Sequence, residues 1–448
     1  MSAAVPGFEI AQRFVALLGG ARVETASGEP CRVRPQTLEE VGAVMRIASE
    51  ERITVTPCGG GTALDEGRSV APPRLLLDCS ALNALLHYDA GDLTLGVQAG
   101  MRVRSIEALL APERQMLPLD VAQRDRATVG GVLATAAHGP LRHAFGGVRD
   151  FCIGIEYVTA DGVIARAGGN VVKNVAGYDL MKLLIGSYGT LAVITAANFK
   201  VFPEAGTYLT LSAEFSSAAD AIRFAGRVRC SPLAPLAVEL LSPRAQQYLS
   251  PERPVRDPDD FVPESPISSN DCWRVLVRAT GSERVLDRYR LELRAMQADV
   301  TESASERELW DTIAELVPCF RAQHRNAMVL DIWSPLAHVA AIAERLDAIA
   351  TDHGFLIAMQ GRIAIGNIVA MLTPLSVDPP AAEHYRGCIE QLRAVLRDGA
   401  TAFVRCAPEE AKRYLDVWGP SPTDHRASLI VKHAMDPDQL LNPGRFLL

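Results

Sequence analysis

The feature that most constrains this chain is a run of three glycines at the end of a strand–helix–strand pattern. Residues 32–57 begin with a short extended piece, and Thr37 with Glu40 forms a capping box ahead of apolar residues at helical spacing. A β-branched segment follows and is expected to end where Pro57-Cys-Gly-Gly-Gly-Thr62 begins. The sequence therefore predicts a βαβ-like unit that closes in a glycine turn.

Such a turn has a specific chemical use. Successive glycines allow backbone N–H groups to converge on a phosphate with no Cβ in the way, and Pro57 fixes the direction of entry. An ordinary turn is the alternative reading. The run matches neither the dinucleotide pattern Gly-x-Gly-x-x-Gly nor the Gly-Lys-[Ser/Thr] of an ATPase loop, which argues against both of those sites.

A second glycine turn, Thr128-Val-Gly-Gly131, offers another close approach of backbone to ligand, or a tight strand-to-helix corner. His138 and His143 follow it. A histidine titrates near neutrality and can orient a substrate or accept a proton, although a loop histidine bonded to backbone is the simpler reading. Further on, Lys173, Tyr178, Asp179 and Lys182 form either an ion-paired surface or, if helical, a shared face for Tyr178 and Lys182.

Composition excludes several classes of protein. The 448 residues suggest roughly two or three domains, and a net charge of -8 with a pI of about 5.7 argues against nucleic acid as a partner. The nine cysteines include no Cys-x-x-Cys pair, so we expect no metal or cluster site and a reduced, cytoplasmic setting. No signal peptide is expected, and the apolar run Ile363–Leu375 is shorter than the ~18 residues that span a bilayer, so membrane contact would be at most peripheral.

The pattern changes at about residue 205. Residues 1–205 mix strands with short helices, whereas residues 206–407 alternate strands and longer helices, as in a second α+β domain. A proline-rich stretch over residues 250–270 is expected to be a surface loop of that domain. Residues 408–448 form a tail with helix signals.

Taken together and in order, the turns are more specific than any one of them. The chain resembles the FAD-binding domain of the vanillyl-alcohol oxidase and p-cresol methylhydroxylase family. Within that family it is most similar to the FAD-binding subunits of bacterial glycolate oxidases. The motifs that carry the resemblance are Pro57-x-Gly-Gly-Gly-Thr62, Val97-x-Ala-Gly100, Thr128-Val-Gly-Gly131, Gly147-x-x-Asp150, Lys173-Asn-Val-Ala-Gly-Tyr-Asp-Leu180, Gly189-Thr-Leu-x-x-Ile-Thr195 and the closing Asp436-Pro to Asn442-Pro-Gly-Arg445.

The resemblance implies an α+β fold: a two-lobed FAD-binding domain over 1–205, a cap domain over 206–407, and a tail over 408–448 that returns to the first domain. It implies that FAD is the cofactor. His143, Ile155 and Val193 would lie near the flavin or adenine. The residues that would hold phosphates and ribityl oxygens are Pro57, Cys58, Gly59, Gly60, Gly61, Thr62, Thr128, Gly130 and Gly131.

Three departures from the family pattern matter. Cys58 stands in the loop where many relatives attach FAD through a histidine, so we expect non-covalent FAD, with His138 as another conceivable attachment point. Tyr188 replaces the carboxylate of the Gly-Ser-Glu-Gly-Thr of related dehydrogenases. Those enzymes also carry His-x-x-Asp-Gly-Asn-x-His for a metal, whereas this chain has Gln360-Gly-Arg-Ile-Ala-Ile-Gly-Asn-Ile368, so no metal site is expected.

The leading functional hypothesis is a flavoprotein subunit of a glycolate oxidase-like complex that converts a small 2-hydroxy acid to the 2-oxo acid. A paralogous flavoprotein subunit would perform the oxidation, and this chain would pass electrons toward an iron–sulfur subunit. The alternative is a self-contained FAD-dependent oxidase or dehydrogenase of another alcohol, a sugar acid or a lactone, with Arg362, His138 or His143 at the substrate. A third reading, a scaffold without cofactor, conflicts with the intact glycine turns.

Overall fold

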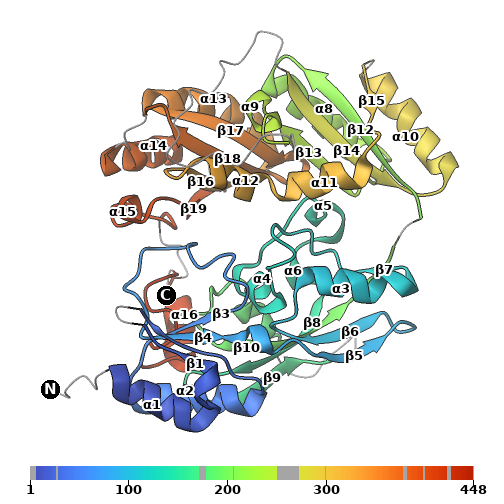
Figure 1. The fold of residues 1–448 in the computed structure, drawn as a ribbon. Coiled ribbons are helices and arrows are strands. Elements are labelled where there is room, and N and C mark those ends of the chain that lie inside the picture. The colour runs from blue at the N-terminus through green and yellow to red at the C-terminus, as the bar shows by residue number, and fades with distance from the viewer. Residues whose placement is uncertain are drawn as a thin grey trace. The chain divides into compact units, whose positions relative to one another are not determined.

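The computed structural model describes residues 7–26, 29–170, 178–204, 206–249, 272–297, 299–376, 381–396, 399–420 and 425–446. The chain divides into two compact units, each with its own hydrophobic core. Unit 1 comprises residues 1–138, 146–204 and 421–448, and unit 2 comprises residues 139–145 and 205–420. In Figure 1, unit 1 contains the blue to green elements from α1 to β11 except α5, together with the red helix α16, and unit 2 contains α5 and the elements from the yellow-green β12 to the red α15.

One layer of unit 1 is a four-stranded sheet in the order β1-β2-β4-β3. Helix α2 packs on this layer because its apolar positions, among them Val41, Val44 and Met45, all face inward. The expected cap is present, since Thr37 Oγ1 accepts a hydrogen bond from the Glu40 backbone N–H at 3.2 Å. The elements are α1 (Gly7–Leu18), η1 (Gly20–Arg22), β1 (Val23–Glu24), β2 (Cys31–Val33), α2 (Leu38–Glu50), β3 (Val55–Cys58), β4 (Leu75–Asp78) and η2 (Cys79–Ala81).

Strand β3 corrects one expectation. The sequence predicts a strand that stops at Pro57, yet Pro57 and Cys58 continue the parallel ladder opposite Leu77 and Asp78. A proline is tolerated there because β3 is the outermost strand of the sheet order, where a missing N–H breaks no central ladder. The glycine loop consequently starts directly from a strand end.

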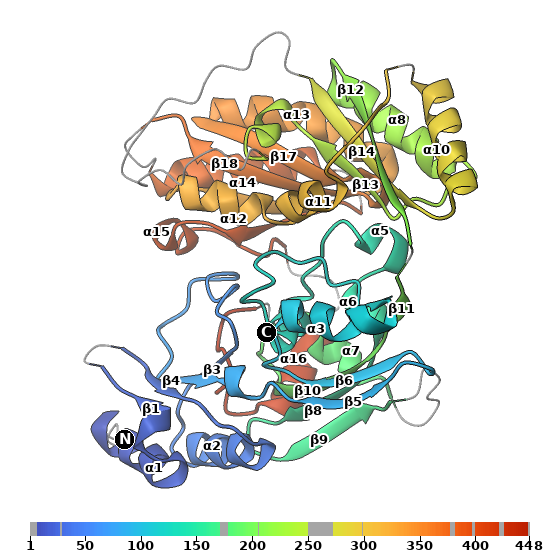
Figure 2. The same ribbon diagram turned by 45° about the vertical axis from the view of Figure 1, so that its right-hand side comes forward.

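The other layer of unit 1 is an antiparallel five-stranded sheet in the order β5-β6-β10-β8-β9, beside a two-stranded β11-β7 pair (Figure 2). The pair Asp161-Gly162, which is typical of hairpin turns, lies in the tight turn between β8 and β9, where Gly162 has a φ of 83°. The strands are β5 (Leu85–Asp89), β6 (Thr94–Gln98), β7 (Gln115–Met116), β8 (Cys152–Val158), β9 (Ile164–Gly168), β10 (Val193–Lys200) and β11 (Phe202–Pro203). The helices are α3 (Val103–Leu110), η3 (Ala111–Glu113), α4 (Val129–Thr135), α6 (Val148–Phe151), α7 (Met181–Leu184) and α16 (His425–Met435).

Unit 2 is built on an antiparallel eight-stranded sheet in the order β15-β12-β14-β13-β17-β18-β16-β19. Its strands are β12 (Tyr208–Phe215), β13 (Ala237–Leu241), β14 (Trp273–Thr280), β15 (Thr301–Glu302), β16 (Met328–Trp333), β17 (Phe355–Arg362), β18 (Asn367–Pro374) and β19 (Thr401–Cys406). Its helices are α5 (Arg142–Phe145), α8 (Ala218–Cys230), α9 (Pro243–Gln246), α10 (Glu283–Met296), α11 (Glu306–Ala314), α12 (Leu316–Gln323), η4 (Leu336–His338), α13 (Val339–Asp352), η5 (Ile363–Ile365), α14 (Ala382–Val395) and α15 (Glu409–Lys412).

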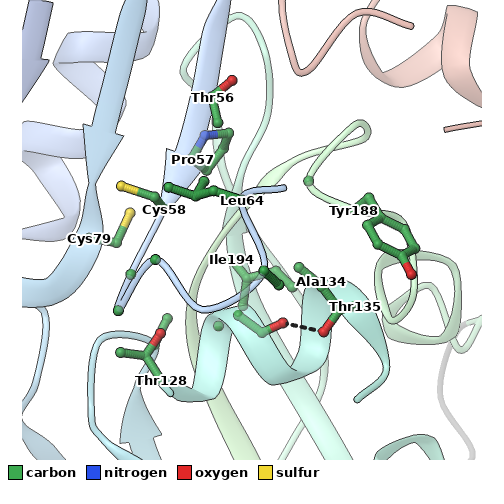
Figure 3. Close-up of a pocket in the computed structure, with 18 of the residues that line it drawn as sticks. Thr56, Pro57, Cys58, Leu64, Cys79, Thr128, Ala134, Thr135, Tyr188 and Ile194 are labelled. Atoms are coloured by element: carbon green, nitrogen blue, oxygen red, sulfur yellow. Dashed lines mark hydrogen bonds between the residues drawn. The ribbon is translucent and has the colours of Figure 1, made fainter. Parts of the chain in front are cut away.

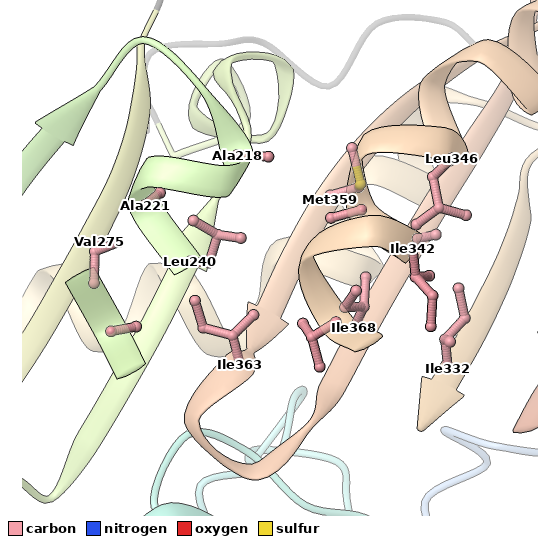
Figure 4. Packing of buried hydrophobic residues seen from close by; sticks show 14 of the residues in the cluster. Ala218, Ala221, Leu240, Val275, Ile332, Ile342, Leu346, Met359, Ile363 and Ile368 are labelled. Carbon is pink, nitrogen blue, oxygen red and sulfur yellow. The ribbon is translucent and has the colours of Figure 1, made fainter. Parts of the chain in front are cut away.

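Both faces of the unit 2 sheet are buried. Met359 of β17 packs with Ile342 and Leu346 of α13 on one face, as Figure 4 shows. Ala358, the next residue along the strand, packs on the opposite face with residues of α9, α11 and α12. Because side chains alternate along a strand, Gln360 and Arg362 share the face of Ala358.

Other expectations meet the structure in different ways. The apolar spacing over 336–350 predicts one helix, whereas the structure has the 3-10 turn η4 followed by α13, which ends at Asp352. Tyr178 and Lys182 do not share one helix, because α7 begins at Met181; Lys182 instead pairs with Asp179 at 2.6 Å. Lys173 and the proline-rich stretch 250–270 lie outside the described residues.

Candidate functional site

The glycine loop forms one wall of a pocket in unit 1 (Figure 3). The pocket is lined by five groups of residues from separate parts of the chain. They are the end of β3 with the loop over 56–64, Cys79 with Ala99, residues 128–135 around α4, residues 188–194 before and in β10, and the C-terminal residues Asn442 and Arg445. Long-range packing therefore assembles a site whose parts are short and local in sequence.

The loop lies so close to its neighbour that only glycine fits. A Cβ on Gly59 would lie 2.0 Å from Thr128 Oγ1, and a Cβ on Gly60 would lie 1.7 Å from the carbonyl oxygen of Arg126. Real Cβ atoms do not come closer than 3.0 Å to a neighbour, so a side chain at Gly60 would displace backbone and one at Gly59 would displace the Thr128 side chain. Gly61 adds a left-handed φ of 71°. The two glycine motifs of the sequence are thus two halves of one cradle.

The C-terminal tail supplies the other wall. Asn442 Oδ1 accepts a hydrogen bond from Thr56 Oγ1 at 2.6 Å, and its Nδ2 donates to the Tyr188 carbonyl at 2.8 Å. Arg445 Nη1 donates to the carbonyl oxygens of Leu64 and Glu66 at 2.6 and 2.8 Å. The tail therefore fastens the far end of the glycine loop and the turn before β10.

Tyr188, which stands where related dehydrogenases carry a carboxylate, has a structural partner in this tail. Its ring stacks on Phe446 with centroids 5.5 Å apart, and its backbone holds a left-handed φ of 54°. The stacking buries apolar surface at the pocket wall. An aromatic pair at this place ties the turn before β10 to the C-terminal residues.

A buried ion pair holds the tail on unit 1. Lys432 of α16 is 4% exposed, and its Nζ donates to Asp436 Oδ2 at 2.5 Å and to the carbonyls of Thr190 and Leu441 at 2.7 and 3.1 Å. Burial lowers the pKa of Lys432, and the Asp436 carboxylate opposes that shift. Asp436 also accepts the backbone N–H groups of Leu440 and Leu441, both at 2.9 Å.

The pocket is nearly without charge. Among its lining residues only Arg445 is ionised, so backbone groups and hydroxyls, rather than charged side chains, would meet a ligand. Burial and the nearby Asp78 carboxylate raise the pKa of Cys58 to about 12. At neutral pH the Cys58 thiol therefore stays protonated and is a poor nucleophile for covalent attachment of a ligand.

The sequence-predicted residues fall in different places. Those of the two glycine motifs, from Pro57 to Thr62 with Thr128, Gly130 and Gly131, all line the pocket. Ile155 and Val193 are 2% and 1% exposed within the cores of unit 1 and are not among the lining residues. The neighbours of Val193, which are Ala192 and Ile194, line the pocket instead.

The two histidines belong to different units. His138 lies half-buried where the first segment of unit 1 ends, whereas His143 lies in α5 of unit 2. Burial and the charge of Arg229 lower the pKa of His143, so its ring is mostly neutral at physiological pH. Neither histidine lines the unit 1 pocket.

Arg362 belongs to a polar network on the unit 2 sheet. Its Nη1 donates to Asn367 Oδ1 at 2.8 Å, and Asn367 Nδ2 donates to Asp331 Oδ1 at 2.6 Å. Nearby on the same face, Gln360 Nε2 donates to Glu239 Oε1 at 2.7 Å. These five residues are each at most 8% exposed. Within the described ranges, no group of three or more His, Cys, Asp and Glu residues is placed to hold a metal ion.

Several residues that line the pocket belong to no motif that points to a ligand site in the sequence. Leu64, Cys79 and Ala134 are ordinary residues in sequence and reach the pocket only through folding. Asn442 and Arg445 did stand in a noted motif at the chain end, but nothing in their spacing says what they touch. The discriminating signal would have been the proline–glycine turn after Asn442, which marks a tail with a fixed course.

Comparison with known proteins defines the class. A model of the FAD binding domain matches residues 30–168, and a model of the C-terminal domain of FAD linked oxidases matches residues 207–397. Among solved structures, p-cresol methylhydroxylase with substrate bound has a TM-score of 0.77 at 16% identity, covering 99% of this chain and 97% of that one. A 4-ethylphenol oxidase from Gulosibacter chungangensis has a TM-score of 0.75 at 17% identity, covering 99% and 98%. The fold is the α+β fold of these flavoproteins.

Curated relatives extend over most of the chain. Glycolate oxidase subunit GlcD of Bacillus subtilis is 25% identical over 92% of this chain and 88% of its own length, and a D-lactate dehydrogenase of Archaeoglobus fulgidus is 28% identical over 92% and 90%. Glycolate oxidase subunit GlcE of Escherichia coli is 40% identical over 141 residues, which are 31% of this chain and 40% of that protein.

The protein is therefore a flavoprotein oxidoreductase that contains two domains found in FAD-linked enzymes. It belongs to the FAD-linked oxidases, with an FAD-binding domain followed by the C-terminal domain of that family. The unit 1 pocket fits the cofactor, because the contacts at Gly59 and Gly60 leave bare backbone along a wall that a Cβ would fill. No helix in the described part of the chain has the length and apolar character needed to cross a membrane.

Proposed function

We propose that this chain is the FAD-binding subunit of a glycolate oxidase-like complex that oxidises a small 2-hydroxy acid. The names of the relatives support the substrate class, since they include subunits of glycolate oxidase and dehydrogenases of D-lactate and D-2-hydroxyglutarate. The observation that carries the proposal is the combination of a pocket walled by bare glycine backbone in unit 1 with a unit 2 network that contains no histidine. Bound FAD supplies a hydride acceptor.

The unit 2 network suits binding better than proton removal. The Arg362 guanidinium offers N–H donors and no acceptor, so it can hold an anion but cannot act as a base. Asn367 orients the guanidinium through its carbonyl oxygen and is itself fixed by Asp331. In the proposed complex, a paralogous flavoprotein subunit would remove the hydroxyl proton and the α-hydride of the 2-hydroxy acid. This chain would pass electrons toward an iron–sulfur subunit.

The nine cysteines of this chain are consistent with an external cluster. None of the nine is in a disulfide, and those among the described residues form no group suited to a metal or cluster. An iron–sulfur subunit would therefore bring its own ligands. The complex would consist of two related flavoprotein subunits and a cluster-bearing subunit, and any contact with a membrane would be made through these partners.

A second candidate is a self-contained FAD-dependent oxidase or dehydrogenase of another alcohol, such as a sugar acid or a lactone. The observation that favours it is the intact, buried hydrogen-bond network around Arg362, since a subunit without substrate has no evident need of an ordered guanidinium. His138 and His143 remain candidates for substrate contacts in this case.

One set of measurements separates the two candidates. The tagged chain is purified from its own cells, co-purifying subunits are identified, and flavin is quantified before and after acid precipitation. The proposal expects FAD in the acid supernatant, iron–sulfur and flavoprotein partners in the eluate, and 2-hydroxy acid oxidation only by the assembly. Steady turnover by the isolated chain with an artificial electron acceptor would favour the second candidate. A colourless protein that takes up no FAD on reconstitution would contradict both candidate functions.

A further inference from the structure

A second cavity lies on unit 1 beside the glycine loop. It shares Gly59, Gly60 and Thr128 with the FAD pocket, but its remaining walls come from β2, the end of β4 and the start of α3. Its volume is about 490 Å³, within the range of roughly 300–1,000 Å³ that small-molecule sites occupy. The loop and the segment 126–128, which touch each other at Gly59 and Gly60, stand between the two cavities.

The charge of this cavity is opposite to that of the whole protein. Its lining contains Arg32, Arg34, Arg102 and Arg126 against a single acidic residue, Asp78, a formal excess of three positive charges. The chain as a whole carries a net charge of -8. A concave surface lined by one sign of charge concentrates ions of the opposite sign.

Asp78 organises two of the arginines without neutralising the site. Its carboxylate is 3% exposed and lies 3.1 Å from Arg34 Nη2 and 3.6 Å from Arg32 Nη1, while its other oxygen accepts the Ser80 backbone N–H at 2.9 Å. One buried carboxylate thus fixes two guanidinium groups, each of which has further N–H donors. Glu24 approaches Arg34 from outside the cavity lining at 3.7 Å and is 62% exposed in its side chain.

The other two arginines are exposed. Among the described residues, no acidic side chain lies within ion-pair distance of Arg102 or Arg126, and Arg126 Nη2 donates to the Gly60 carbonyl at 3.2 Å. Ser80, Asn83 and Ser105 add neutral hydrogen-bonding groups to the lining. Guanidinium groups fixed around one cavity suit phosphate and carboxylate groups, which they bind in bidentate geometry.

We propose that this cavity is a binding site for a small multivalent anion, distinct from the FAD site, which carries phosphate or carboxylate groups and contacts Arg102 and Arg126 from the solvent side. Because the glycine loop borders both cavities, an anion here would rest against the outer face of the loop that holds FAD. The ligand class is set by the positive charge and by the concave, polar lining. The proposal does not depend on the substrate or partners of the protein.

Titration calorimetry on the FAD-saturated protein tests the proposal, with inorganic pyrophosphate as the phosphate probe and citrate as the carboxylate probe at low ionic strength. We expect saturable binding of at least one probe that weakens as salt is added, because salt screens exposed charges. Arg102→Gln and Arg126→Gln should each weaken binding at least tenfold while flavin absorbance persists. Arg104→Gln is the matched control, since Arg104 is on the same helix but pairs with Glu107 and Asp125 outside the lining, and should leave binding unchanged.

The two probes distinguish the source of the anion: tighter pyrophosphate assigns a phosphate ligand, and tighter citrate assigns a carboxylate ligand. Three results would overturn the proposal. These are no saturable binding of either probe, equal affinity in the Arg102→Gln variant and the Arg104→Gln control, or binding to the apoprotein that disappears when FAD is saturating. The last result would make the cavity part of the cofactor site.

Discussion

At the scale of single residues, the absence of side chains at the loop matters as much as any side chain present. Gly59 and Gly60 bring the strand end of β3 against the segment 126–128, and the contact distances leave no room for a methyl group. Arg445 is the only charged residue that lines the glycine-loop pocket of unit 1, whereas four arginines and one aspartate line the neighbouring cavity. The cofactor is accordingly expected to bind through backbone and hydroxyl groups.

A substitution at Gly60 should expose this dependence. The methyl group of Gly60→Ala would meet the Arg126 carbonyl oxygen at 1.7 Å, so the loop has to move, and we expect FAD affinity to fall at least tenfold in a fluorescence titration. Gly226→Ala in α8 is the matched control, because no heavy atom lies within 4 Å of the added Cβ. The control should bind FAD normally and gain up to about 1 kcal/mol in stability. Unchanged affinity in Gly60→Ala would contradict the cradle.

The thiol of Cys58 should be nearly inert despite its place at the pocket. With a pKa of about 12, roughly one molecule in ten thousand is ionised at pH 8, and only the thiolate reacts. We expect iodoacetamide to modify the exposed Cys230 first and Cys58 far more slowly, with the Cys58 rate rising about tenfold per pH unit as the thiolate fraction grows. Peptide mass spectrometry of timed samples measures both rates. Fast modification of Cys58 at pH 8 would contradict the raised pKa of this thiol.

At the scale of elements, the sequence predicts only part of the helices and strands of the two units and errs at some of their ends. The apolar segment 75–78 predicts a strand and the segment 103–110 predicts a helix, and β4 and α3 have these bounds because apolar residues and turn signals coincide there. The predicted end of β3 is too early, because the local rule that proline ends a strand takes no account of the outer position of β3 in its sheet. It also cannot foresee that a 3-10 turn precedes α13, since both kinds of helix share the same local spacing of apolar residues.

The attachment of α16 and the tail depends on a buried charge pair, and this gives a prediction. Lys432→Met leaves the Asp436 carboxylate, which is 0% exposed, without its cation, and breaking such a pair costs about 3 kcal/mol or more. We expect that loss in urea unfolding of the FAD-free protein. His433→Ala, on the exposed side of the same helix, should change stability by less than about 0.5 kcal/mol. Equal effects of the two substitutions would show that the pair is not what holds the tail.

At the scale of the whole molecule, the two units have separate cores, and all the residues that line the glycine-loop pocket belong to unit 1. A ligand stabilises the part of a protein that binds it, by about 2.7 kcal/mol at a concentration of 100 times Kd. We therefore expect two calorimetric transitions, of which only the one from unit 1 moves to higher temperature as FAD is added. Fluorescence of Trp273, Trp310, Trp333 and Trp418, all in unit 2, assigns the other transition. An equal shift of both transitions would contradict this expectation.

By itself the sequence determined the βαβ-like start, the glycine turns, the cofactor class implied by their order, and the lack of a histidine pair on β17 and β18. These features are local, because a glycine run or the lack of a histidine can be identified in the sequence without knowing how the chain folds. Only the tertiary structure decided that Gly59 and Thr128 touch, that Asn442 joins Thr56 to Tyr188, and that His138 and His143 fall in different units. Contacts between residues hundreds of positions apart are set by packing and by pairing of buried polar groups, and no local pattern records them.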